Sequence, residues 1–459
     1  MAGIGFALRR LSRQDSLNSG LQAYGHAAFV ACGPWLFTIL ALAAVEVFGS
    51  TLLSREELQR FFVIVMYNFA FSLVVAGPLV LVLTRRLADR IYAKDVSEIP
   101  GMFIGSLALL FVMHLAVGVP FYGYVADLPE VERLLALMGF LTVGGIWTAS
   151  TFMSALKSFS SISVAFVAGM ATALAAVALL SRSYGVPGML AGFDIGLAVI
   201  FFVLAARIFA EYPFAAEQLF SFLGSFQKNW EFALVGLFYN AGIWVDKWIM
   251  WLSPGRLVIA GAMPVHPAYD SAMFLSYLTI IPAMTMFLVV FETQFFELYL
   301  RFYRSIEQHA TAAEIHHNHD LILRALGRGL RNLFVLQAVV CYVAILVAPA
   351  LIAKVQGGIE MVPIFRFGVL GAFFHVMLLS NLVVIAYFDL RRVLLAVSAF
   401  FFLSNGGLTL AALWFGFGYE GYGYFMSTLA TLIFALSLTI PRVLRLPYMT
   451  FIGNNPGLR

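Results

Sequence analysis

The stretch NLFVLQAVVCYVAILVAPALIA, residues 332–353, decides the fold class of this chain. It contains no Asp, Glu, Lys or Arg, and it follows a basic segment that carries Arg324, Arg328 and Arg331. A helix of about 20 predominantly apolar residues is long enough to cross the hydrocarbon core of a bilayer. The stretch therefore predicts a transmembrane helix.

Eleven further stretches have the same character, so the chain is predicted to be an all-α polytopic membrane protein. Hydrophobic residues make up 62% of the 459 residues and charged residues only 11%. Sustained apolar runs of this length are the signature of membrane-spanning helices. The twelve predicted spans are residues 22–49, 61–83, 101–124, 133–156, 159–180, 187–209, 231–252, 271–292, 332–353, 364–388, 393–416 and 420–440.

The basic residues fall unequally on the two sides of these spans. With a cytoplasmic N-terminus, the cytoplasmic segments hold 20 of the 28 Lys and Arg residues and the opposite side holds seven, while Lys247 lies within a span. Short cytoplasmic loops of membrane proteins are enriched in Lys and Arg. Both termini are therefore predicted to be cytoplasmic. The formal net charge of +4 reflects this topology and does not indicate nucleic-acid binding.

No soluble domain can be separated from the spans. Six spans in each half is an even number, which predicts two lobes related as parallel repeats. At the N-terminus, Ile4, Leu8 and Leu11 recur at helical spacing beside arginines, as in a helix that lies on a lipid surface. The predicted order is a cytoplasmic-surface helix (1–21), an N-terminal six-helix lobe (22–209), a cytoplasmic linker (210–230), a C-terminal six-helix lobe (231–440) with a cytoplasmic loop (293–331), and a cytoplasmic tail (441–459).

Three charged residues interrupt the predicted spans: Asp194 in the sixth, and Asp246 and Lys247 in the seventh. A charge in the membrane interior costs at least ~2.5 kcal/mol on insertion scales and usually faces a protein interior or an aqueous cavity. Two hypotheses stay open: a buried ion pair that locks helices together, and a place in the transport path or in ion coupling. Because neighbouring side chains on a helix diverge by ~100°, we expect Lys247 to reach an acid other than Asp246.

Three further residues within spans are candidates for the transport path. His375 lies near the centre of the tenth span, and Trp244 and Trp248 share one face of the seventh at i and i+4. An intramembrane histidine is more often satisfied by an interhelical hydrogen bond. Tryptophan faces can stack on sugar rings or hold cations, and they pack against lipid at least as often. Both interpretations stay open for each residue.

Signatures of an enzyme or of a cofactor site are absent from the sequence. It carries no Walker loop, no dinucleotide fingerprint and no pair of metal-binding cysteines. The two cysteines, Cys32 and Cys341, both fall within spans and are expected to be small buried hydrophobic residues. Four histidines between residues 309 and 319 lack the fixed spacing of a metal site, and they favour a solvated or docking surface. No catalytic residue, cofactor or metal is therefore predicted.

The N-terminal region resembles that of a known transporter family. The opening MAGIGFALRRLSRQDSL (1–17), followed by LQAYGHAAFVACGPWLFTI (21–39), is similar to the start of the Pel exopolysaccharide transporter (PelG-like) family, within the multidrug/oligosaccharidyl-lipid/polysaccharide (MOP) superfamily. The twelve-span pattern agrees over the whole chain, whereas the specific match is concentrated in these two stretches. The resemblance implies two six-helix, MATE/MOP-like lobes around a central cavity and a partly acetylated, aminosugar-rich polymer as substrate. It also implies a complex with a cytoplasmic glycosyltransferase, a cyclic-di-GMP receptor and a repeat-containing membrane protein.

The expected function is export of a Pel-like exopolysaccharide across the bacterial inner membrane, from cytoplasm to periplasm, during biofilm matrix synthesis. A pyrophosphate-linked substrate would call for arginines in the path, and the spans contain one lysine and no deeply placed arginine. Two alternatives are a MATE-type proton- or sodium-coupled drug/cation antiporter, in which Asp194 or Asp246 exchanges the ion, and a lipid-linked oligosaccharide flippase. A third is a scaffold that assembles the synthase without conducting polymer.

Overall fold

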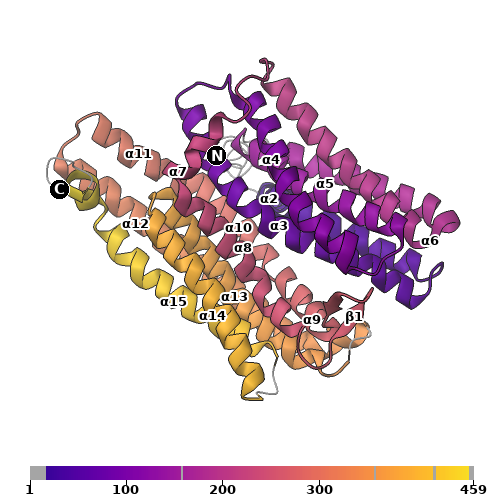
Figure 1. Ribbon diagram of the computed structural model, residues 1–459. Coiled ribbons are helices and arrows are strands. Elements are labelled where there is room, and N and C mark those ends of the chain that lie inside the picture. Colours follow the sequence, from indigo (N-terminus) through magenta and orange to yellow (C-terminus); the bar gives the residue numbers. More distant parts are fainter. Residues whose placement is uncertain (1–16, 157–158, 356–357, 417–419, 454–459) are drawn as a thin grey trace. The chain divides into compact units, whose positions relative to one another are not determined.

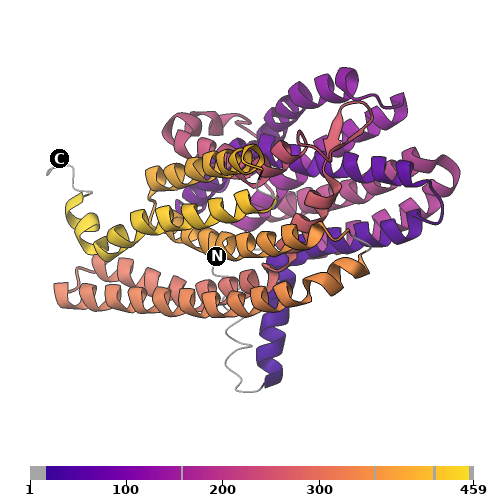
Figure 2. The same ribbon diagram turned by 90° about the horizontal axis from the view of Figure 1, so that it is seen from below.

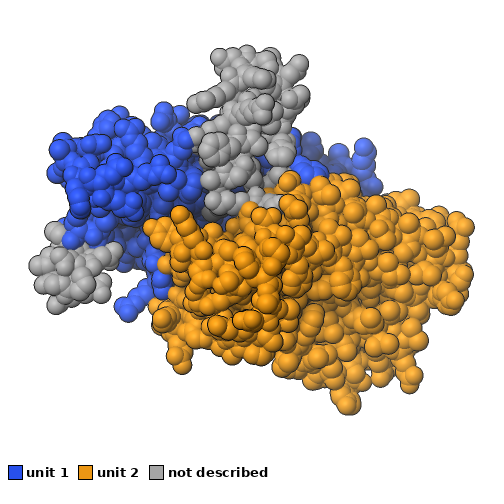
Figure 3. Space-filling model, turned by 90° about the horizontal axis from the view of Figure 1, so that it is seen from above, with its two compact units in different colours: residues 1–31, 268–459 blue, residues 32–267 orange. Residues whose placement is uncertain are grey.

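The computed structural model describes residues 17–156, 159–355, 358–416 and 420–453, and most of its regular structure is helical (Figure 1). Most of the predicted surface helix at 1–21, and the end of the predicted tail, lie outside these residues. The chain forms two compact units (Figure 3): unit 2 is residues 32–267, and unit 1 is residues 1–31 with 268–459.

Unit 2 is a helical bundle in which α3 packs against α5 and α8, and α5 packs against α4 and α6. A capping box begins α3, because the Ser54 hydroxyl accepts from the Glu57 backbone N–H while the Glu57 carboxylate accepts from the Ser54 N–H. The elements are α2 (Leu17–Gly49), which enters the unit at Cys32, α3 (Arg55–Tyr92), α4 (Ile99–Pro120), η1 (Phe121–Val125), α5 (Glu130–Ala155), α6 (Phe159–Glu211), η2 (Ser221–Leu223), α7 (Gly224–Lys228), α8 (Trp230–Met250), β1 (Leu257–Ile259) and β2 (Met263–Val265).

The 53-residue α6 is two helices joined at Gly185. The φ of Gly185 is 59° and its ψ is −133°, a conformation that side-chain-bearing residues rarely adopt. The two halves fold back on each other, since a Cβ built on Gly192 would lie 2.5 Å from the Val177 nitrogen. The predicted fifth and sixth spans, 159–180 and 187–209, are therefore the two arms of this hairpin.

Ten helical segments of the described residues are long and apolar enough to cross a membrane, and α6 counts as one of them. They cover every predicted span except the seventh. That span is α8, whose mean hydropathy is lowered by Asp246 and Lys247. The chain is therefore a multi-pass membrane protein.

The backbones of α3 and α8 meet at Gly77 and Gly236. A Cβ built on Gly77 would lie 2.6 Å from the Gly236 carbonyl oxygen, so neither position has room for a side chain. Close approach through small residues is a common way for membrane helices to pack. Nearby, the Asn240 amide donates to the Leu73 carbonyl at 3.1 Å. The helix of the seventh predicted span, α8, therefore belongs to the same unit as the helices that precede it.

A β-hairpin lies between the predicted seventh and eighth spans, where the sequence predicts an outer loop. Strands β1 and β2 pair antiparallel, and residues 260–262 form a three-residue loop between Ile259 and Met263. Two residues of this loop, Ala260 and Gly261, have positive φ, at 45° and 68°. The Ala260 carbonyl accepts from the Asp127 N–H at 2.9 Å, and Met263 and Val265 are buried in the core of unit 2.

The predicted linker at 210–230 lies on α4 within unit 2. Gly101 and Gly105, one helical turn apart, have no room for a Cβ because the carbonyl groups of Glu217 and Leu219 lie against them. At the same end of the bundle, the Glu98 carboxylate binds Arg86 at 3.1 Å and Arg90 at 2.6 Å. Backbone contact therefore holds this segment on α4, and the Ser221 hydroxyl donates to the Glu98 carboxylate at 3.3 Å.

Unit 1 contains the remaining helices, with α13 packed against α12 and α15, and α14 against α15. Its elements are α9 (Pro267–Leu278), α10 (Ile281–Val290), η3 (Phe291–Phe295), α11 (Phe296–Glu307), α12 (Ala312–Lys354), α13 (Met361–Tyr387), α14 (Arg391–Trp414), α15 (Tyr422–Leu444), α16 (Leu446–Tyr448) and η4 (Met449–Gly453). The predicted eighth span is α9 and α10, interrupted before Pro282.

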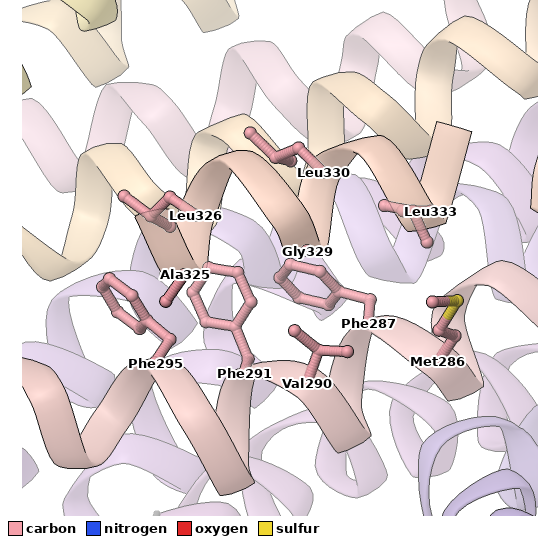
Figure 4. Close-up of a pocket in the computed structure, with 10 residues that line it drawn as sticks. All are labelled: Met286, Phe287, Val290, Phe291, Phe295, Ala325, Leu326, Gly329, Leu330 and Leu333. Atoms are coloured by element: carbon pink, nitrogen blue, oxygen red, sulfur yellow. The ribbon is translucent and has the colours of Figure 1, made fainter. Parts of the chain in front are cut away.

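The segment 293–331, predicted as a cytoplasmic loop that begins as an amphipathic helix, is helical nearly throughout. α11 runs alongside the first part of α12 (Figure 2), and the two enclose a small core that includes Phe302, Ile315 and Ile322. In the adjoining crevice, Phe287, Phe291 and Phe295 point toward α12, where Gly329 leaves room for Val290 (Figure 4). Apolar residues at helical spacing explain why the two helices of this stretch pack against each other.

Candidate functional site

Asp194 lies at a junction of α3, η1, α5 and α6 in unit 2. The Tyr122 hydroxyl donates to the Asn68 amide oxygen at 2.7 Å, and the Asn68 amide nitrogen donates to the Ala136 carbonyl at 3.0 Å. A Cβ built on Gly139 would lie 2.6 Å from one Asp194 oxygen and 2.8 Å from the Asn68 nitrogen. The missing side chain at Gly139 therefore makes the space that Asp194 and Asn68 share.

One oxygen of Asp194 has no hydrogen-bond partner. Its Oδ2 atom is buried and makes no hydrogen bond within the part of the chain that the structure describes. Removing an ionised carboxylate from water carries a penalty of several kcal/mol unless another group compensates it. This arrangement can take up a proton or a cation at Asp194. Asn68 is recognisable in the sequence as an amide within an apolar span, for which an interhelical hydrogen bond is expected, whereas Tyr122 was not predicted.

A second polar set lies on α3, α4 and α5, and it includes His114, a polar residue within a predicted span for which an interhelical hydrogen bond is expected. The His114 Nδ1 donates to the Leu110 carbonyl at 3.0 Å, and its buried Nε2 makes no hydrogen bond among the described residues. On α3, one turn beyond Asn68, Ser72 accepts from the Trp147 indole N–H at 3.2 Å. The interior of unit 2 thus holds several hydrogen-bonding groups within its membrane-spanning helices.

The expectation for Lys247 was wrong, because the ammonium binds the adjacent Asp246. The Lys247 Nζ lies 3.1 Å from Oδ2 and 3.2 Å from Oδ1 of Asp246, and it also donates to the Ile243 carbonyl at 3.1 Å. Neighbouring Cβ atoms do diverge around a helix, but the four-carbon lysine stem is long and flexible enough to fold back. Asp246 is fully buried and Lys247 is 6% exposed, so this pair is shielded from solvent.

Trp244 and Trp248 of α8 pack against protein. The Trp248 ring stacks on Phe71 of α3, with centroids 5.5 Å apart and planes 1° from parallel. The Lys247 ammonium lies 5.8 Å from the Trp244 ring centre, within the range of a cation–π contact. Neither indole N–H has a hydrogen-bond partner among the described residues, although both are buried. Trp248 therefore contributes to the contact between α3 and α8.

An aromatic stack that sequence reasoning missed lies next to these residues. Tyr67 stacks on Trp251 at 4.9 Å and on Phe121 at 5.8 Å, with planes 10° and 15° from parallel. The Tyr67 hydroxyl donates to the Pro264 carbonyl at 2.7 Å. This bond ties α3 to the β-hairpin, so the stack and the hairpin are positioned together.

His375 is held within unit 1. Its Nδ1 lies 2.7 Å from the Tyr424 hydroxyl oxygen, and the ring contacts Phe401 and Tyr277 with centroids 5.2 and 6.2 Å away. His375 is 2% exposed and Tyr424 is fully buried. The structure therefore places His375 in a hydrogen-bonded aromatic cluster on α9, α13, α14 and α15.

The predicted site residues thus fall into three groups. Trp244, Asp246, Lys247 and Trp248 share α8, Asp194 joins the polar junction elsewhere in unit 2, and His375 belongs to unit 1. Within the described ranges, no group of three or more His, Cys, Asp or Glu side chains is placed to hold a metal ion.

Comparison with solved structures identifies the fold. A point mutant of a MATE protein is 15% identical, with a TM-score of 0.64 over 93% of this chain and 96% of that chain. An outward-facing MATE family transporter of the MOP superfamily is 14% identical with a TM-score of 0.64 over the same shares. A MOP superfamily transporter from Pyrococcus furiosus is 14% identical, with a TM-score of 0.62 over 92% of this chain and 96% of that one. The chain therefore has the MATE/MOP transporter fold.

The sequence match is more specific than the fold. No curated protein matches the sequence. A family described as "PelG: Putative exopolysaccharide Exporter (EPS-E)" matches residues 1–451, which is nearly the whole chain. Together with the fold, this match identifies a membrane transporter and not an enzyme. The chain belongs to the PelG exopolysaccharide exporter family.

Proposed function

We propose that this chain exports a Pel-like, aminosugar-rich polysaccharide from cytoplasm to periplasm across the bacterial inner membrane. The family match and the transporter fold support this proposal. In the proposed topology the hairpin of α6 counts as two spans, and α8 adds one to the remaining nine candidates. The chain then has twelve spans and cytoplasmic termini, in agreement with the distribution of Lys and Arg.

The observation that carries the substrate class is the ion pair between Asp246 and Lys247. Lys247 is the only lysine within the predicted spans, and its ammonium is already bound by the neighbouring carboxylate. A lipid-linked pyrophosphate needs basic groups to hold its charge, and a bidentate arginine suits it best. A path without such groups favours a neutral or cationic glycan and disfavours the lipid-linked oligosaccharide flippase.

Asp194 supports a role for ion coupling. The Asp194 carboxylate, beside Tyr122 and Asn68, has one buried oxygen without a hydrogen-bond partner among the described residues, and it can exchange a proton or a cation as the transporter changes conformation. This feature also favours the second candidate, a MATE-type drug/cation antiporter, because such a carrier needs an exchangeable ion site. Asp246 is less suited to exchange, since it is paired with Lys247.

The helical hairpin of α11 and α12 is the proposed docking site for the cytoplasmic glycosyltransferase. Arg324, Arg328 and Arg331 are exposed and follow one another at i, i+4 and i+7 on α12. Such a stripe suits an acidic partner surface. The cyclic-di-GMP receptor and the repeat-containing membrane protein remain partners expected from the resemblance.

Inverted membrane vesicles with and without this chain test the function. The vesicles contain the cognate synthase and receive nucleotide sugar, and the measured quantity is the fraction of polymer protected from an added glycoside hydrolase. Protection that requires the chain is expected for an exporter. Polymer that stays accessible points to a scaffold, and proton-driven accumulation of a cationic dye in the vesicles without polymer protection points to the antiporter.

A further inference from the structure

An uncharged, open-sided cavity of about 220 Å³ lies between α3, α5 and α8 of unit 2. It is far larger than the about 10–15 Å³ that one water molecule needs, and smaller than the about 300–1,000 Å³ of pockets for drug-sized ligands. None of its ten lining residues is ionisable. They are Leu73, Ala76, Gly77, Val80, Thr84, Trp147, Ser150, Thr151, Ser154 and Asn240.

The polar part of the wall presents hydrogen-bond acceptors. Thr84, Thr151 and Ser154 each donate the hydroxyl proton to a backbone carbonyl four residues earlier, at 2.8 to 3.0 Å. A hydroxyl that donates in this way keeps its oxygen lone pairs as acceptors. The Asn240 amide donates to the Leu73 carbonyl at 3.1 Å, and its chemistry supplies a second N–H and an acceptor oxygen.

The remaining wall is apolar and contains one indole. The Trp147 N–H donates to the Ser72 hydroxyl at 3.2 Å, which fixes the orientation of the ring. A flat indole beside acceptor oxygens and a donating amide matches a pyranose ring, which combines apolar C–H faces with hydroxyl groups around its edge. An ammonium or a phosphate in the same place would lose its hydration without a counter-charge.

We propose that this cavity binds one neutral, hydroxyl-bearing sugar ring of the transported glycan. The inference deepens the proposed export function and rests on it. The cavity lies along the second halves of α3 and α5, toward the end where Glu98 binds Arg86 and Arg90. In the proposed topology this is the cytoplasmic half, so the cavity receives sugar that arrives from the synthase.

Cysteine protection in the purified full-length chain tests the site directly. In a C32A/C341A background, Ser154→Cys places a thiol in the cavity wall. Thr142→Cys is the matched control, because Thr142 also lies on α5 and donates to the carbonyl four residues earlier but does not line the cavity. The probes are tri-N-acetylglucosamine, which is neutral, its deacetylated cationic form, and trigalacturonic acid, which is anionic.

The neutral trimer should slow alkylation of Ser154→Cys, by the factor 1 + [L]/Kd, or about tenfold at nine times the Kd. The neutral trimer should leave the alkylation rate of Thr142→Cys unchanged. Equal protection by the charged trimers, equal protection of the control, or no protection at any trimer concentration overturns the proposal.

A second variant connects the cavity to export. Ser150→Trp fills the cavity, and it should abolish polymer protection in the vesicle assay at normal membrane abundance, whereas Thr142→Trp should not. Undiminished export by a normally abundant Ser150→Trp protein overturns the proposal. If wild-type vesicles export no polymer, the proposed function fails, and the alkylation result still decides whether the cavity binds sugar.

Discussion

The Lys247 ammonium lies 3.1 Å from the Asp246 carboxylate, so a buried ion pair joins two consecutive residues of one helix. Because the two charges are opposite, the pair adds no net charge to the apolar helix α8. It does not by itself hold α8 to a neighbouring helix. The contact with α3 is made instead by Gly77, Gly236, Asn240 and the stack of Trp248 on Phe71.

Neutralising one member of this pair should lower the amount of folded protein. Removing one partner of a buried pair leaves an uncompensated charge, which destabilises by about 3–5 kcal/mol, whereas removing both can be nearly neutral. We therefore expect low membrane abundance for Asp246→Asn and for Lys247→Met, and recovery in the double variant. Abundance and secreted polymer are measured together. A normally abundant Asp246→Asn protein with no export would place Asp246 in the transport mechanism instead.

Asp194→Asn should abolish export while leaving the protein folded. Asparagine keeps the size of the side chain and removes the charge, so a group that exchanges a proton or cation loses its function without a packing defect. Polymer export and membrane abundance are the measurements, and Asp127→Asn, at an exposed position, is the control. Full export by Asp194→Asn would assign this carboxylate a purely structural role.

The spans were predictable because each requires a long apolar run that the sequence displays directly. The hairpin of α6 was predicted as two spans for the same reason, since the polar stretch 181–186, which contains Arg182, separates two apolar runs. The β-hairpin was not predictable, because three-residue strands carry too little periodicity to be distinguished from a loop. The helical character of 293–331 beyond its first turns was likewise hidden by its charges.

The candidate site was predictable only residue by residue. An intramembrane acid such as Asp194 stands out because of its insertion penalty, but its neighbours Asn68 and Tyr122 come from helices far apart in the sequence. The pairing of Lys247 was mispredicted because the directions of Cβ atoms do not determine where a long side chain ends. Contacts of this kind depend on helix packing, which apolar runs do not specify.

Gly77→Ala should destabilise the protein through the contact of α3 with α8. The added methyl group would lie 2.6 Å from the Gly236 carbonyl oxygen, and overpacking of this kind costs about 1–3 kcal/mol. Gly327→Ala is the matched control, since no atom lies within 4 Å of a Cβ there and alanine favours a helix. Thermal unfolding in detergent should show a lower midpoint for Gly77→Ala only. Equal midpoints for both variants would contradict the close approach.

Impermeant thiol labelling should report the proposed topology. In the C32A/C341A background, Asp127→Cys is expected to react with reagent added outside cells, and Glu307→Cys only after the membrane is permeabilised, because the excess of Lys and Arg marks the cytoplasmic side. Both positions are exposed, so burial does not limit either reaction. The opposite labelling pattern would show that the chain has the reverse orientation in the membrane.

Replacing Arg324, Arg328 and Arg331 with Ala should weaken co-purification of the cytoplasmic glycosyltransferase. The three side chains are exposed on one stripe of α12, so their loss removes charge without opening the core around Phe302 and Ile322. Exposed interfacial charges act mainly on association and are screened by salt, so the wild-type complex should also weaken as ionic strength rises. Arg301→Ala with Arg304→Ala, both exposed on α11, is the control for a general effect of positive charge. An equal loss from the control would assign docking to overall charge, and unchanged association of the triple variant would move the docking surface away from α12.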